Sequence, residues 1–230
     1  MHTNLITGAV AVVALFGPVF IIAAGRLFTN GSLLALFIYY LLTGLYNLMD
    51  LDLIPATPHI KQQAGIVFNY LDTPLMLIVL LFFCNDTWKR KLVQLLLVLF
   101  LLFEVFIALR FGMGIQSSVY LLGPGTVLIL LLSLLFFSHY GKMTIVRGKG
   151  QGKTYMLASI AFSYATFLIL YYLHYLVRTS AEADVFLIYY TGVFISATVM
   201  CVGLLWIIRR TREIRERQLT RKELALFFDK

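Results

Sequence analysis

The sequence contains few charged residues: Asp, Glu, Lys and Arg make up 13% of its 230 residues, against about 25% in soluble proteins. Hydrophobic residues make up 60% of the chain, which leaves too few polar side chains to cover a water-facing surface of this size. This composition disfavours a soluble enzyme, a disordered chain and a nucleic-acid-binding protein. A polytopic membrane protein is the class that remains.

Cysteines and nucleotide motifs are also scarce. The two cysteines, Cys84 and Cys201, lie far apart in apolar stretches, so we expect free thiols and neither a disulfide framework nor a cysteine metal site. The segment from Gly148 to Thr154 ends like a phosphate-binding P-loop. However, Arg147 occupies the position of the first glycine, and a membrane helix is expected before it where the motif requires a strand. We interpret this segment as a flexible basic loop.

Apolar runs of about 20 residues are long enough to cross a bilayer as helices. The sequence has seven such runs, separated by segments rich in Gly, Pro, Asn and Asp: 5–24, 33–52, 65–84, 91–110, 118–138, 154–177 and 185–208. None alternates in polarity as a membrane β-strand would. The predicted fold class is an all-α integral membrane protein, a seven-transmembrane-helix bundle without a soluble domain.

The basic residues predict the orientation. With the N-terminus outside, 16 of the 19 Lys and Arg residues lie in cytoplasmic segments, and only Lys61, Arg110 and Arg178 lie outside. Because cytoplasmic loops carry the excess of basic residues, we expect the N-terminus outside and the C-terminus in the cytoplasm. The first residues, MHTNLITG, lack a basic region, so we expect the first run to be a retained helix. The expected location is the plasma (inner) membrane.

The C-terminal tail, 209–230, alternates basic residues with Glu213, Glu216 and Glu223 and ends in an apolar patch. This pattern favours a basic amphipathic helix, supported by the i,i+4 pair of Glu213 and Arg217. We expect this helix to lie on anionic lipid, and docking to a cytoplasmic protein is the alternative.

Polar side chains within the spans gather in the predicted outer half. One face of the second span carries Tyr39, Thr43, Tyr46, Asn47 and Asp50 at helical spacing. The other spans contribute Asn69, Asp72 and Thr73, then Glu104, then Tyr171 and His174, and finally Tyr189, Tyr190 and Thr191. The inner halves are nearly continuous hydrocarbon, with runs such as LMLIVLLFF.

This asymmetry predicts a polar pocket open to the outside and closed below by apolar packing. We expect the second, third, fourth, sixth and seventh helices to border it above the level of Thr43 and Met76. The candidate ligand-binding residues are Asn47, Asp50, Asn69, Asp72, Glu104, Tyr171, His174 and Tyr190. Ionisable groups inside spans are functional candidates because they are costly to bury. Each also has a structural interpretation: Asp50 could face water, Glu104 could pair with Arg110 or His174, and the tyrosines could form an aromatic belt.

A receptor or sensor for a small ligand, signalling through its basic cytoplasmic face, is the function that this arrangement favours. An outer-leaflet enzyme is the alternative, and a small-molecule transporter is third, since a transporter site is expected near the midplane. Asp50, His59, Asp72, Glu104 and His174 include carboxylate and imidazole groups that suit zinc, but their spacing is not that of a dedicated site. We therefore assign no metal ligand, and the sequence favours a protein that is not an enzyme.

The third span also carries a resemblance. The segment Tyr70-Leu-Asp72-Thr73-Pro74-Leu75-Met76-Leu77 is similar to the third helix of the microbial rhodopsins, where an acidic residue precedes a Thr-Pro-Leu-Leu-like run. In that family several residues separate the acid from Thr-Pro, whereas Asp72 directly precedes it here. The resemblance implies the seven-helix architecture and a retinal-sized interior pocket. The family's retinal-binding lysine is missing, because 185–208 contains no Lys, so we expect no covalent retinal.

Overall fold

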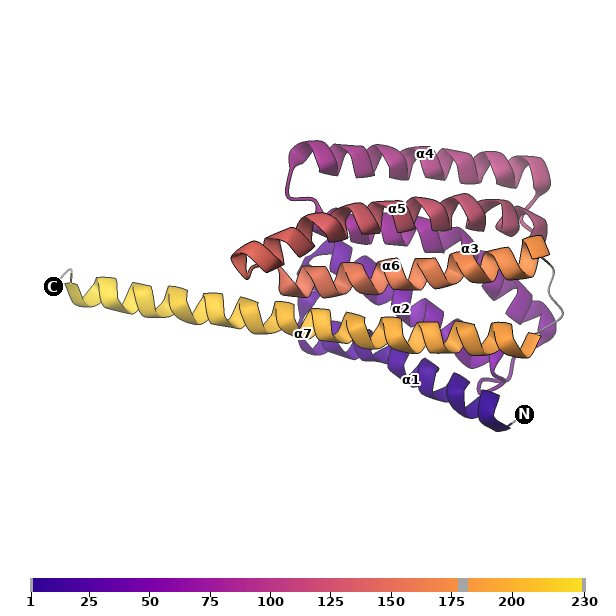
Figure 1. Cartoon of the computed structure of the whole chain (residues 1–230), viewed down its shortest axis with the longest axis horizontal. Coiled ribbons are helices and arrows are strands. Elements are labelled where there is room, and N and C mark those ends of the chain that lie inside the picture. Colours follow the sequence, from indigo (N-terminus) through magenta and orange to yellow (C-terminus); the bar gives the residue numbers. More distant parts are fainter. Residues whose placement is uncertain (1, 178–181, 229–230) are drawn as a thin grey trace.

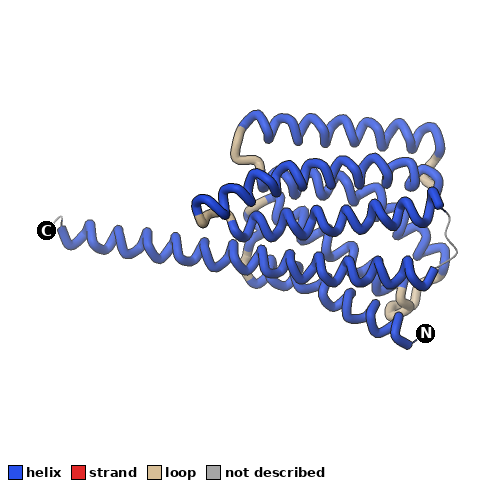
Figure 2. The backbone as a smooth tube through the Cα atoms, in the orientation of Figure 1, coloured by secondary structure: helices blue, strands red, loops and turns tan. Residues whose placement is uncertain are grey.

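The computed structural model describes residues 2–177 and 182–228, and within these ranges the chain is helical throughout with short connections (Figures 1 and 2). The helices are α1 (His2–Ala24), α2 (Gly31–Asp50), α3 (Pro58–Leu80), α4 (Thr87–Phe111), α5 (Ile115–Arg147), α6 (Gln151–Tyr171) and α7 (Glu182–Phe228). Short 3-10 turns follow α1 and α3, at Leu27–Thr29 and Leu81–Phe83, and a π-helical turn, Tyr172–Val177, follows α6.

All seven helices are long and apolar enough to cross a membrane. The prediction of an all-α protein with seven spans is therefore confirmed, and the chain is an integral membrane protein. Several helices extend beyond the expected runs. α3 begins at Pro58 rather than 65, because Thr57 caps it through its Oγ1 and Pro58 occupies a first-turn position, where proline is favoured. α5 continues to Arg147 and ends at Gly148, whose φ of 59° is left-handed.

Six of the helices form a closed ring, in the order α1, α2, α3, α5, α6 and α7, with α7 packed back against α1. α4 lies outside this ring and packs on α3 and α5, at one edge of the bundle in Figure 1. We refer to the end of the bundle with the start of α1 and the loops 51–57 and 112–114 as the N-terminal end. The opposite end, with the loops 25–30, 84–86 and 148–150, is the tail end.

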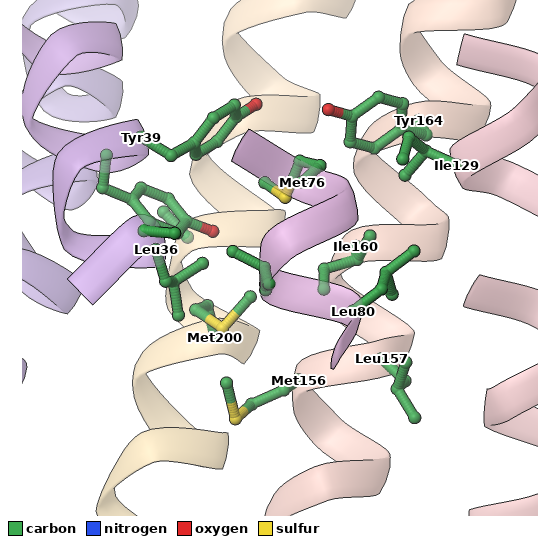
Figure 3. Close-up of a cluster of buried hydrophobic side chains, with 14 of the residues drawn as sticks. Leu36, Tyr39, Met76, Leu80, Ile129, Met156, Leu157, Ile160, Tyr164 and Met200 are labelled. Atoms are coloured by element: carbon green, nitrogen blue, oxygen red, sulfur yellow. The ribbon is translucent and has the colours of Figure 1, made fainter. Parts of the chain in front are cut away.

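The ring interior is filled by large side chains that are almost completely buried. Its members come from several helices of the ring and include Leu36, Met76, Leu80, Met156, Leu157, Ile160 and Met200 (Figure 3). α6 and α7 approach closely because Gly152 and Gly203 face one another: a Cβ atom at Gly203 would lie 2.9 Å from the carbonyl oxygen of Gly152. Side chains packed this closely cannot rearrange without losing favourable contacts.

α7 is one continuous helix of 47 residues. Its second half leaves the bundle at the tail end and continues in the direction of its first half (Figure 1). That the tail lies on anionic lipid stays a prediction. The helix continues past the bundle without a break. The physical reason is local: no proline or glycine follows Gly203, and the ion pair of Arg209 with Glu213, at 3.2 Å between Nε and Oε1, spans one turn of the helix where it leaves the bundle.

Candidate functional site

An acidic side chain lies inside the ring, in contact with a tyrosine from a helix that is not its neighbour in the ring. Asp72 of α3 is only 4% exposed, and Tyr164 of α6 is fully buried. The Tyr164 hydroxyl donates a hydrogen bond of 2.9 Å to Oδ2 of Asp72. Since α5 separates α3 from α6 in the ring, this bond joins two helices across the interior.

A second tyrosine, Tyr39 of α2, lies near Tyr164, and the two hydroxyls point toward one another in Figure 3. In the Asp72 carboxyl, Oδ2 accepts the hydrogen bond from Tyr164. The other carboxyl oxygen, Oδ1, is buried and has no hydrogen-bond partner among the described residues. A buried acceptor without a donor is costly, so this oxygen is available to a donor group that enters the ring.

Proline shapes the helix around Asp72. Pro74 has no N–H, so the carbonyl of Tyr70 lacks its usual partner within α3. The preceding residue, Thr73, is buried against Gly125 of α5, which directly follows Pro124. A side chain at Gly125 would collide with the Thr73 hydroxyl. The two proline-containing stretches therefore meet beside the acid and fix its position.

A second polar group joins α2 to α7 nearer the N-terminal end. Tyr189 donates to Oδ1 of Asn47 at 3.1 Å, and Tyr190 donates to Oδ2 of Asp50 at 3.4 Å. The Asn47 amide in turn donates to the carbonyl oxygen of Thr43, one turn earlier in α2. We call Tyr39, Asn47, Asp50, Asp72, Tyr164, Tyr189 and Tyr190 together the polar cluster.

The space inside the ring is small. A cavity of about 10 Å³ lies between Tyr39, Thr43, Met76 and side chains of α1, α6 and α7, which is room for about one water molecule. Small-molecule pockets usually enclose roughly 300–1,000 Å³. This cavity is smaller than the pocket expected at this level and than the retinal-sized interior that the rhodopsin resemblance implied, because large side chains such as Tyr39, Met76 and Ile160 surround it.

Glu104 lies apart from the polar cluster. It belongs to α4, outside the ring, and is 7% exposed, with Oε1 lacking a hydrogen-bond partner in the described part of the chain. Phe100, one turn earlier, lies near Gly125, which places this face of α4 against the ring. No ion pair joins Glu104 to Arg110 or His174 within the described ranges. Of the five helices expected to border one cavity, α2, α3, α6 and α7 line the small cavity inside the ring, together with α1, whereas α4 does not reach it.

The remaining candidates from the sequence lie elsewhere. Asn69 is half-buried on α3. Tyr171 donates to the carbonyl oxygen of Val119 at 3.4 Å, and so faces α5. His174 is exposed and contacts only the ring of Tyr175 among the described aromatic contacts. Thus the structure brings together Asn47, Asp50 and Tyr190, places Asp72 with Tyr39 and Tyr164, and separates Glu104, Tyr171 and His174 from them.

Sequence reasoning missed Tyr164 as a site residue, and it treated Tyr189 as part of an aromatic belt. One signal was available for Tyr164. It lies near the middle of the sixth span, in SIAFSYATFL, whereas tyrosines of membrane helices gather at the two interfaces. A tyrosine at this depth requires a polar partner for its hydroxyl, and Asp72 is the acid at comparable depth.

Within the residues that the structure describes, no group of three or more His, Cys, Asp or Glu side chains is arranged to hold a metal ion. Comparison of the chain with protein-family models, with curated proteins and with solved structures finds no match in any of the three.

Replacement of Tyr164 by Phe tests the bond across the ring. The change removes the donor of Oδ2 of Asp72, so we expect the free energy of unfolding to fall by about 1–3 kcal/mol. Thermal unfolding in detergent measures the loss. Tyr155→Phe, on the exposed side of the same helix, is the matched control and should change stability by less than about 0.5 kcal/mol. Equal melting temperatures for both variants would show that the bond contributes nothing.

Proposed function

We propose that the protein is a membrane receptor or sensor whose small ligand engages the polar cluster. The observation that carries this proposal is the course of α7. The same continuous helix holds Tyr189 and Tyr190 in the polar cluster and then leaves the bundle as the charged tail. A shift of the cluster would therefore move the tail, because a helix transmits displacement along its axis without an intervening hinge.

The chemistry of the cluster indicates the kind of ligand. Oδ1 of Asp72 accepts no hydrogen bond in the described structure, and the carboxyl of Asp50 lies at the exposed end of α2. Both groups favour a ligand that carries a cation or a strong hydrogen-bond donor. Since the ring interior is filled, entry of such a ligand requires the tyrosine contacts between α2 and α7 to open at the N-terminal end. That opening is the conformational change by which the receptor would respond to the ligand.

Orientation is part of the proposal: the N-terminal end faces outside and the tail lies in the cytoplasm, as the distribution of Lys and Arg favours. Cysteine labelling tests it in a background without Cys84 and Cys201. His59 is exposed in the first turn of α3, at the N-terminal end. A cysteine at this position should react with an impermeant maleimide in intact cells. A cysteine at Lys149, exposed in the loop between α5 and α6, should react only after permeabilisation. The reverse pattern would overturn the orientation.

Small molecules that copurify with the protein test the ligand itself. The wild type and Asp72→Asn are extracted from membranes in polymer-bounded lipid discs, denatured, and analysed by mass spectrometry. We expect a compound enriched with the wild type and reduced about fivefold or more in Asp72→Asn, since the lost charge weakens a charge-assisted hydrogen bond by about 1–3 kcal/mol.

Asp52→Asn is the matched control for this experiment. Asp52 is an acid at the same end of the bundle, but it is exposed, pairs with Lys61 on the surface at 2.7 Å, and has a left-handed φ of 58° that asparagine tolerates. The compound should remain with this variant. Identical extracts from all three proteins, or a lower melting temperature of Asp72→Asn with unchanged ligand content, would remove Asp72 from the proposed site.

A further inference from the structure

A cavity of about 470 Å³ lies at the tail end, where α6 begins and α7 leaves the bundle. Its wall includes Lys153 at the start of α6 and Arg209 and Arg210 on α7, together with the apolar side chains of Trp206 and Ile207. This volume is within the range of small-molecule sites. The cavity is at the opposite end of the molecule from the polar cluster, so it is independent of the proposed receptor function.

The positive charge of the cavity exceeds its negative charge. Lys153 donates from Nζ only to neutral oxygens: the Phe82 carbonyl at 3.0 Å, Oδ1 of Asn85 at 3.3 Å and the Tyr140 hydroxyl at 3.2 Å. These contacts satisfy its hydrogen bonds and hold it in place, but no acid within the described ranges neutralises its charge.

The other charged groups leave this excess in place. Glu213 is the acid in the wall, and it pairs with Arg209. Arg210 forms no ion pair in the described part of the chain. Asp86, in the nearby loop, pairs with Lys89 at 2.7 Å, and that hydrogen bond holds the pKa of Asp86 below its usual value. The cavity therefore attracts an anion.

The backbone at the start of α6 adds to this attraction. Gly150 precedes the helix in a left-handed conformation, with φ of 93°, and supplies no side-chain cap. The first N–H groups of a helix have no acceptor within the helix and carry a partial positive charge. Gln151, Gly152 and Lys153 line the cavity, so the first turn of α6 lies beside Arg209 and Arg210.

The apolar part of the wall indicates what carries the anion. Trp206 and Ile207 belong to the membrane-spanning part of α7, and the Arg209 guanidinium lies 5.8 Å from the centre of the Trp206 ring. Tryptophan is enriched where the hydrocarbon meets the headgroups. A free anion would use the bases alone, whereas a phospholipid would use the bases for its phosphate and the apolar wall for its glycerol and acyl portions.

We infer that this cavity binds the phosphate headgroup of an anionic glycerophospholipid, held by hydrogen bonds from Arg209, Arg210 and the first amides of α6 and by the charge of Lys153. Basic pockets between membrane helices bind such headgroups in other proteins. The site joins the α5–α6 loop to α7 at the point where the tail begins. Bound lipid therefore anchors the base of the tail at the membrane boundary.

The test is a titration of the full-length protein in neutral detergent, followed by native mass spectrometry. The probes are dihexanoylphosphatidylglycerol, its zwitterionic counterpart dihexanoylphosphatidylcholine, and inorganic phosphate. We expect one phosphatidylglycerol to bind at least about fivefold more tightly than phosphatidylcholine. The double variant Arg209→Gln/Arg210→Gln should weaken that binding about tenfold or more, since each base near a membrane surface contributes about 1 kcal/mol to the binding of anionic lipid.

The matched control is Arg212→Gln/Arg217→Gln, which removes two charges from the same helix at positions outside this cavity. It should retain wild-type affinity within about twofold, and melting temperatures confirm that both proteins are folded. Equal weakening by the two double variants would show attraction to the tail's overall charge and would overturn the site. Displacement of the lipid by inorganic phosphate at an equal concentration would also overturn it, because the ligand would then be a free anion.

Discussion

The burial of the Asp72 carboxyl inside a ring of membrane helices is the constraint on which the rest of the structure depends. A carboxyl at this depth is costly unless a donor satisfies it, and Tyr164 of α6 donates a hydrogen bond to Oδ2. This bond joins α3 and α6 across the interior of the ring. The other oxygen, Oδ1, has no hydrogen-bond partner among the described residues, so it can accept a hydrogen bond at the centre of the bundle.

α7 connects this centre to both ends of the molecule. Near the N-terminal end it contributes Tyr189 and Tyr190, and near the tail end its Trp206, Arg209 and Arg210 line the basic cavity. Its close approach to α6 at Gly203 leaves little freedom for independent movement of the two helices. A rearrangement of the tyrosines would therefore displace α6 and α7 together, and both helices line the basic cavity.

The number and places of the spans could be predicted from the sequence, because hydropathy alone determines which segments can cross a bilayer. The contacts within the site could be predicted only in part. Helical spacing placed Asn47 and Asp50 on one face of α2, but it could not show that Tyr189 and Tyr190 face them. The position of α4 outside the ring depends on helix packing, which hydropathy does not encode, and so Glu104 was grouped with Asp72. The straight tail likewise depends on continuity with α7.

The most direct test of the coupling between the polar cluster and the tail is a distance measurement by pulsed electron paramagnetic resonance. Spin labels at cysteines replacing Arg90, exposed at the start of α4, and Arg217, exposed on the tail, report the position of α7 in lipid vesicles. Our account predicts that Asp72→Asn shifts the distance distribution by about 2 Å, the scale of a helix shift, while Asp52→Asn leaves it unchanged. Superimposable distributions for all three proteins would contradict the account.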